Sequence, residues 1–531
     1  MKQLQFIKMA LSIAFAMTLI ITAPLYTLAQ TSGFSISPIV RRGEPSPDRG
    51  HFFNCDDCEG RINGAHAFNN KGEMGLAADT EGKCYDALFF FSPDGSSVLA
   101  DSCSETPFGK LGYGWVNVNE QRQAVFLGLP LVNDRFVATL FLYTSGQLRK
   151  LVAEGDLTPA GGIFKGCGFS EPSINDKGEV AFGACADKDL IGENDGVYIY
   201  SEGQIRKVAI YGDPSPIGGF LALNFIPAIT PILNNNSEVL FHGGVIIEPN
   251  IPEKYGLFLA TKDGVKKIIV DGDPLTDGNI VFPRSLGIGD LNDKSEVVFT
   301  VKVQGKADTG IYLNANGRIS KIMAQGDVTP IGGTFATLED PDLIERFLFI
   351  RPRINANSAV AFQAKVIDGS SKQGIFLASP KAMLKVVAVG DTIPTGETIR
   401  EIDTFALNDN SEVAFFAYGR KGHELPLGVF KATPVTPAIK KLKLKRKSGV
   451  LELRVIGNSF ITNDTTIEIN GVALEAMSYP EEAREDGGTT RQLNSRDARL
   501  EQLLTPGQTV QVKVFNSLTN RRSDEKAFTR Q

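Results

Sequence analysis

The clearest copy of a recurring eight-residue pattern reads Asn175-Asp176-Lys177-Gly178-Glu179-Val180-Ala181-Phe182. An Asn-x-x-Gly or Asn-x-x-Ser turn runs into a short apolar segment, which is typical of a turn that leads into a β-strand. Further clear copies occupy residues 234–241, 292–299 and 408–415. Aligned on the first Asn, seven units begin at Asn69, Asn119, Asn175, Asn234, Asn292, Asn355 and Asn408. In the two weaker copies Gly75-Leu76 replaces Ala-Phe, and Arg122 replaces the Gly.

Each unit contains four strand-like segments. In the third unit they are residues 171–174, 179–182, 196–200 and 204–209, and the last segment ends in a Gly-Asp-x-x-Pro loop. The segments are rich in β-branched and aromatic residues, with Gly, Asn and Asp at the joints. The recurring Asn residues are 50–63 residues apart. Four short strands in a repeat of this length predict an all-β fold and the blade of a β-propeller.

The order of the segments predicts how the ring closes. The signature of a fourth strand also occurs before the first turn, at residues 38–45. The seventh unit ends with its third strand at residues 428–430 and has no fourth. An open first or last blade would leave a bare strand edge. We therefore predict a seven-bladed β-propeller over residues 33–433, closed by the N-terminal strand.

The composition changes after the seventh unit. Residues 434–438 begin Pro-Val-Thr-Pro and predict a linker. Residues 440–447 alternate Lys or Arg with Leu, which favours a strand with a solvated basic face over a nucleic-acid or surface-binding patch. Further strands are expected at 450–456, 466–469 and 510–515. Residues 439–531 therefore predict a small Ig-like β-sandwich.

The N-terminus predicts export. Lys2 and Lys8 precede an apolar run that ends in Thr27-Leu28-Ala29, a small-residue cleavage site. We interpret residues 1–29 as a Sec-type signal peptide, with an uncleaved membrane anchor as the alternative. The expected product is a secreted monomer without a membrane span. A net charge of −6 does not indicate nucleic-acid binding.

Six cysteines fit an oxidising compartment, and all lie between residues 55 and 185. Cys84 and Cys103 are equidistant from the turn at 92–95, so a hairpin would bring them within disulfide reach. Cys167 and Cys185 flank the Asn175 turn in a similar way. For Cys55 and Cys58 a local disulfide is favoured over a zinc site or redox catalysis. A bond between Cys58 and Cys84 is an open alternative.

The tandem units resemble the bacterial choice-of-anchor NxxGxxAF repeat proteins over most of residues 36–432. The resemblance is carried best by residues 175–182, 355–362 and 408–415. It implies a secreted or surface-displayed protein of undefined biochemical role. The tail resembles an IPT/TIG-type immunoglobulin-like domain through residues 455–460, 467–471 and 505–510. Neither family supplies a catalytic residue.

The Gly-Asp loops supply the candidate binding residues. A carboxylate recurs at the same point of the repeat, and a ring of such groups on one face could hold a cation or a basic partner. In the alternative, each carboxylate caps its own turn through backbone N–H groups. The residues concerned are Asp156, Asp213, Asp273, Asp327, Asp391 and, in the N-terminal copy, Glu44.

Catalytic and cofactor motifs are missing from the sequence. It has no Gly-x-Ser-x-Gly elbow, no phosphate-binding Gly-rich loop and only four His. The Asn-rich turns offer too few carboxylates for a calcium loop. We expect no cofactor and no metal, and a non-enzymatic module that binds an extracellular protein or glycan. The alternatives are an extracellular propeller enzyme, a polysaccharide lyase or hydrolase, and a structural component of the envelope or matrix.

Overall fold

The computed structural model describes residues 29–531 except 31–32, 48–49, 54–59, 62–66, 82–85, 102–110, 187–194, 224–229, 249–252, 288, 305–308, 339–350, 421–424, 479–483 and 486. The described chain is almost entirely β-structure, with one four-residue helix, α2 (Leu500–Leu503). This confirms the predicted all-β class. The proposed signal peptide lies almost wholly outside the described residues.

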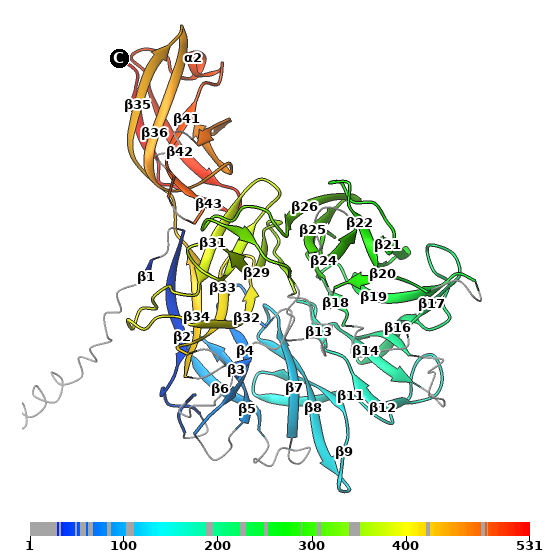
Figure 1. Cartoon of the computed structure of the whole chain (residues 1–531). Coiled ribbons are helices and arrows are strands. Elements are labelled where there is room, and N and C mark those ends of the chain that lie inside the picture. The colour runs from blue at the N-terminus through cyan, green and yellow to red at the C-terminus, as the bar shows by residue number, and fades with distance from the viewer. Residues whose placement is uncertain are drawn as a thin grey trace, which may run out of the picture.

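Each repeat forms one antiparallel sheet. In the third repeat the strand order is β12 (Phe164–Phe169), β14 (Val180–Ala186), β15 (Gly196–Ser201) and β16 (Gln204–Ile210), and β13 (Ser173–Ile174) also pairs with β14. Neighbours in the sequence are neighbours in the sheet because short turns join antiparallel strands. The sheets stand around a common centre in a β-propeller arrangement (Figure 1).

The other sheets follow the same order. The first contains β3 (Gly60–Arg61), β4 (Met74–Asp79), β5 (Asp86–Ser92) and β6 (Gly95–Asp101), and the second contains β7 (Leu111–Val118), β8 (Gln123–Val132), β9 (Arg135–Phe136), β10 (Thr139–Thr144) and β11 (Gln147–Ala153). The fourth contains β17 (Phe220–Ala222), β18 (Ile232–Leu233), β19 (Val239–Ile246), β20 (Lys254–Thr261) and β21 (Gly264–Val270). The fifth contains β22 (Ile280–Leu286), β23 (Asp290–Leu291), β24 (Val297–Gln304), β25 (Thr309–Ala315) and β26 (Arg318–Ala324). The sixth contains β27 (Thr334–Phe335), β28 (Arg353–Ile354), β29 (Val360–Ile367), β30 (Gln373–Ala378) and β31 (Met383–Ala388).

The last sheet combines both ends of the repeat region. Its order is β1 (Ala29–Gln30), β2 (Phe34–Arg41), β34 (Pro426–Pro434), β33 (Val413–Tyr418) and β32 (Glu401–Leu407). Strand β2 pairs with β34 in a register that runs from Phe34 opposite Pro434 to Arg41 opposite Gly428. The N-terminal strand thus lies beside the third strand of the last repeat, as the sequence predicts.

Apolar side chains fill the spaces between successive sheets. Ile199 of the third sheet and Phe241 of the fourth share one buried cluster. Phe89 of the first sheet and Phe416 of the last share another. Burial of each such side chain contributes about 1.5–3 kcal/mol, so these contacts between neighbouring sheets dominate the stability.

The C-terminal domain, residues 438–531, consists of two sheets around its own core. One has the order β35 (Ala438–Lys447), β36 (Val450–Ile461), β41 (Thr489–Ser495) and β39 (Met477–Ser478), with β40 (Arg484–Glu485) on β41. The other has the order β38 (Val472–Leu474), β37 (Thr465–Ile469), β42 (Thr509–Asn516) and β43 (Arg521–Arg522), with β44 (Lys526–Thr529) on β42.

The C-terminal domain rests directly on the propeller. Its Leu518 packs in the cluster between the sixth and seventh sheets. The Gly487 N–H donates to Pro330 O at 2.8 Å, and the Lys385 N–H donates to Gly487 O at 3.0 Å. Only residues 435–437 separate β34 from β35. Backbone contacts of this kind restrain the domain more than a linker alone would.

Candidate functional site: an axial ring of asparagine turns

The recurring Asn organises its own turn through its side-chain oxygen. Asn175 Oδ1 accepts the N–H of Lys177 at 3.1 Å and of Glu179 at 3.0 Å. The fourth residue of the turn, Gly178, has φ 75°. A positive φ also occurs at this position in the other six turns, where one residue is Gly, four are Ser and one is Arg122. Gly adopts this conformation without cost, whereas the Ser residues and Arg122, at φ 60°, are strained.

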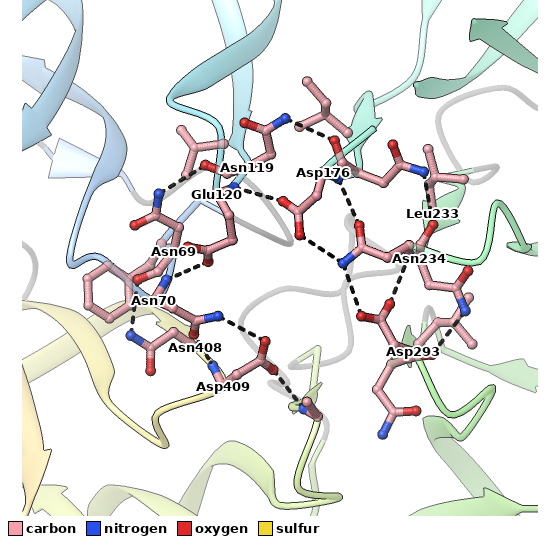
Figure 2. A pocket seen from close by; sticks show the side chains of 18 of the residues that line it. Asn69, Asn70, Asn119, Glu120, Asp176, Leu233, Asn234, Asp293, Asn408 and Asp409 are labelled. Atoms are coloured by element: carbon pink, nitrogen blue, oxygen red, sulfur yellow. Dashed lines mark hydrogen bonds between the residues drawn. The ribbon is translucent and has the colours of Figure 1, made fainter. Parts of the chain in front are cut away.

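The side-chain nitrogen of the same Asn reaches the next repeat. In every repeat, Nδ2 donates to the backbone carbonyl of the next recurring Asn, at 2.9–3.3 Å. The series continues from the last repeat to the first, since Asn408 Nδ2 donates to Asn69 O at 3.0 Å (Figure 2). In five repeats Nδ2 also donates to the Glu four residues later, as Asn175 does to Glu179 at 2.8 Å. The recurring Glu is therefore part of the turn.

A second series of bonds joins the residues that follow each Asn. The Asn70 N–H donates to Glu120 Oε1 at 2.7 Å, and the Glu120 N–H donates to Asp176 Oδ1 at 2.8 Å. The series continues through Asn235 and Asp293, and the Ala356 N–H donates to Asp409 Oδ1 at 2.7 Å. Ala356 has no side-chain acceptor, so the series is interrupted where Asp293 would donate.

These turns surround a pocket of about 110 Å³ at the centre of the propeller. Glu120, Asp176, Asp293 and Asp409 line it, and Figure 2 shows them from several repeats around one opening. No Lys or Arg lines it among the described residues. The residue before each Asn adds an apolar layer to the lining, formed by Phe68, Val118, Ile174, Leu233, Leu291, Ile354 and Leu407. A drug-sized ligand needs several times this volume, whereas an ammonium or guanidinium group fits.

The acidic ring perturbs its own titration. Burial raises the pKa of the Glu120 carboxyl, and the carboxylates of Asp176 and Asp409 raise it further. The hydrogen bond from Asn70 and the charge of Lys71 act in the opposite direction. A positive charge placed in the pocket would oppose this rise in pKa, because it favours the ionised form of Glu120.

An ionic network lies next to this pocket on the inner strands. Arg351 of the sixth repeat pairs with Glu171 of the third at 3.0 Å. The Ile354 N–H donates to Asp290 Oδ2 at 3.0 Å. Burial, together with the charge of the neighbouring Arg351, lowers the pKa of the Arg353 guanidinium to about 10. The pair between the third and sixth repeats links sheets that are far apart in the sequence.

The Gly-Asp loops lie at the end of the sheets opposite to the Asn turns. Antiparallel strands alternate in direction, so a turn after the first strand and a loop after the fourth strand lie at opposite ends. Asp213 Oδ2 accepts the Ile210 N–H at 2.9 Å, and its other oxygen pairs with Lys207 at 2.8 Å. The same two contacts, to the N–H three residues earlier and to a Lys six residues earlier, occur at Asp156, Asp273, Asp327 and Asp391. Glu44 accepts the N–H of Arg41 and pairs with its guanidinium.

The predicted site carboxylates are thus each engaged within their own turn. This geometry matches the turn-capping alternative, and the structure does not bring the six carboxylates to one pocket. Their role in binding a partner stays a prediction. The Lys partners could have been found in the sequence, because the spacing Lys-x5-Asp recurs at all five Asp.

The axial pocket was missed for a different reason. One turn alone provides too few carboxylates for a site, and only the packing of the sheets brings the seven turns to one place. Two signals could have revealed it: an acidic residue follows the Asn in four of seven turns, and an apolar residue precedes it in all seven.

Most cysteine predictions lie outside the described residues, namely Cys55, Cys58, Cys84 and Cys103. Cys185 is disulfide-bonded. It lies in β14, which pairs with β12, the strand that contains Cys167. The pairing of Cys167 with Cys185 stays a prediction.

The described part of the chain contains no group of three or more His, Cys, Asp or Glu side chains arranged to hold a metal ion. It also contains no helix with the length and apolar character needed to cross a membrane.

The sequence matches one family model, at residues 12–350 and 301–434, and the chain therefore belongs to the family of unknown function DUF7453. No curated protein matches it. The resemblance to NxxGxxAF and IPT/TIG proteins stays a prediction.

Many solved structures are similar to this chain at low identity, and three of them are named here. The β-propeller domain of the Trilobed protease from Pyrococcus furiosus has a TM-score of 0.36 and 9% identity, over 66% of this chain and 90% of that one. The polysaccharide lyase Uly1 has a TM-score of 0.36 and 9% identity, over 70% and 90%. PorZ, a bacterial surface component of the type-IX secretion system of Porphyromonas gingivalis, has a TM-score of 0.30 and 10% identity, over 91% and 69%. Similarity at this level does not bear on activity or ligand.

Proposed function

We propose that the chain is a closed seven-bladed β-propeller that acts outside the cell as a non-enzymatic binding module. Its axial pocket would hold a compact cationic group of an extracellular protein or glycan. Three features support closure: the pairing of β2 with β34, the shared cluster of the first and last sheets, and the Asn408 to Asn69 bond. The apolar, cleavable character of residues 1–29 supports export.

The observation that carries the binding proposal is the charge of the pocket. Four carboxylates from four different repeats line it, without a cation among the lining side chains that the structure describes. The hydrogen bonds between turns hold these carboxylates in place, so a ligand does not have to order them. Suitable ligands are a Lys ammonium, an Arg guanidinium or the protonated amine of an amino sugar.

The test is to measure by calorimetry whether the protein binds pentalysine and chitosan oligosaccharide. The N-acetylated form of each probe, which lacks the positive charges, is the comparison. We expect the cationic probes to bind and the acetylated probes not to bind. The variant Asp176→Asn/Asp293→Asn/Asp409→Asn keeps one oxygen at each position for the backbone N–H of the neighbouring turn and removes three charges. It also replaces the oxygens that accept the side-chain amides of Asn70 and Asn235. The affinity for the cationic probes should fall at least about tenfold.

A matched control removes three charges elsewhere. Asp134, Asp263 and Asp368 are exposed and lie outside the pocket. The Asn variant of these three residues should bind as the wild type does. Equal loss in both variants, or equal binding of charged and acetylated probes, would refute a specific axial site.

A further inference from the structure

One face of the C-terminal domain carries a row of lysines that is independent of the axial pocket. Residues Ile439, Leu442 and Leu444 of β35 pack against the core of the domain. The alternate residues Lys441, Lys443, Lys445 and Lys447 therefore point to the outer face of the sheet. At about 6.7 Å between successive members, the row spans about 20 Å along the strand.

The neighbouring strand extends this positive surface. Lys443 lies opposite Arg454 on β36, and Lys445 lies opposite Glu452. Residues directly opposite each other in an antiparallel pair share a face. Glu452 is buried and bonds both Arg454, at 2.8 Å, and Arg496, at 2.6 Å. Among the side chains of this face that the structure describes, six positive charges thus accompany one carboxylate, in a protein whose net charge is −6.

The four lysines have no ion-pair partner within the described part of the chain, unlike the five lysines that pair with the Gly-Asp loops. β35 is the edge of its sheet, and lysines on an edge strand also prevent strand-to-strand aggregation. Edge protection does not account for Arg454, because β36 is an inner strand, nor for Arg496, which follows the inner strand β41.

We infer that this face binds a linear anionic polysaccharide, whose carboxylate or sulfate groups lie along the lysine row. Charge complementarity identifies the class of partner, because regularly spaced cations on a flat strand match regularly spaced anions on an extended chain. None of the four residues that lie opposite these lysines on β36 is aromatic; they are Val450, Glu452, Arg454 and Ile456. Single-stranded nucleic acid is usually held by such aromatic platforms.

The test is binding of the full chain to immobilised polygalacturonate and to heparin. We expect retention at about 50 mM NaCl and release by about 500 mM, because salt screens exposed charges. The variant with Lys441, Lys443, Lys445 and Lys447 changed to Gln should bind at least tenfold more weakly. Changing the same four residues to Arg should restore binding.

The control variant changes Lys254, Lys262, Lys266 and Lys372, which are exposed lysines of the propeller, to Gln. It loses the same charge and should bind as the wild type does. A Gln variant of the row that self-associates but still binds the polysaccharides would assign the lysines to edge protection and overturn the inference. Tighter binding of the wild-type protein to single-stranded DNA or phosphatidylglycerol vesicles than to either polysaccharide would also overturn the inference.

Discussion

The two recurring turns of the repeat use similar polar side chains over different distances. The Gly-Asp turn is closed within itself, since Asp327 bonds an N–H three residues away and a Lys six residues away. The Asn turn does the same with its oxygen, but its nitrogen crosses to the next repeat, as from Asn292 to Asn355 O at 3.0 Å. Recurrence alone does not separate a local turn from a contact between repeats.

The difference has an energetic consequence. A local turn can be lost while the sheets stay packed, because its bonds connect residues that remain close in any case. Asn292 is 5% exposed and makes four side-chain hydrogen bonds, one of them to another sheet. Its removal leaves buried backbone and carboxylate groups without partners, which costs more than the bonds themselves contribute.

The largest predicted effect follows from this contrast. Asn292→Ala should lower the free energy of unfolding by about 2–6 kcal/mol, since four bonds of about 0.5–1.5 kcal/mol each are lost. Asp327→Ala, the matched change in the other turn, should cost about 1 kcal/mol because its side chain is 36% exposed and caps one N–H. Urea-induced unfolding measures both values. Equal costs would remove the distinction between the turns.

The sequence predicted the strands and their order because period-two patterns and turn residues are local. Pairing of β2 with β34 was also predictable, since residues 38–45 repeat the fourth-strand signature. The ring of Asn bonds was not predictable from one turn. The nitrogen of Asn175 could donate to its own turn or to Asn234 O, and only the packing of neighbouring sheets decides between them.

The pH dependence of the axial pocket gives the next effect in size. Burial and the carboxylates of Asp176 and Asp409 raise the pKa of Glu120, so its charge is lost at a higher pH than that of an ordinary carboxyl. A cation should therefore bind more weakly as the pH falls through this raised pKa. Glu120→Gln should keep the Asn70 N–H bond and flatten the pH profile of pentalysine binding. An unchanged profile in this variant would exclude Glu120 as the titrating group.

A smaller effect is expected where the ring is interrupted. The methyl side chain of Ala356 cannot accept the Asp293 N–H, whereas the equivalent bond from the Asn235 N–H to Asp293 Oδ1 measures 2.8 Å. Ala356→Asn supplies the acceptor and should stabilise the protein by about 0.5–1 kcal/mol. Ala356→Val adds volume without an acceptor and serves as the control. A gain of the same size in both variants would attribute the effect to packing.

The smallest effect concerns the lysines of the local turns. Lys150 is 43% exposed and pairs with Asp156 at 3.0 Å, and such surface pairs contribute about 0–1 kcal/mol. Lys150→Ala should therefore change the free energy of unfolding by less than about 0.5 kcal/mol, and the change should vanish in about 1 M NaCl. Lys385 is only 16% exposed, so Lys385→Ala should cost more and keep most of its cost in salt because its buried stem also packs. Equal, salt-sensitive losses of unfolding free energy in the two variants would mean that charge alone governs these turns. Large losses in both variants would place the Gly-Asp turn with the Asn turn as a determinant of the fold.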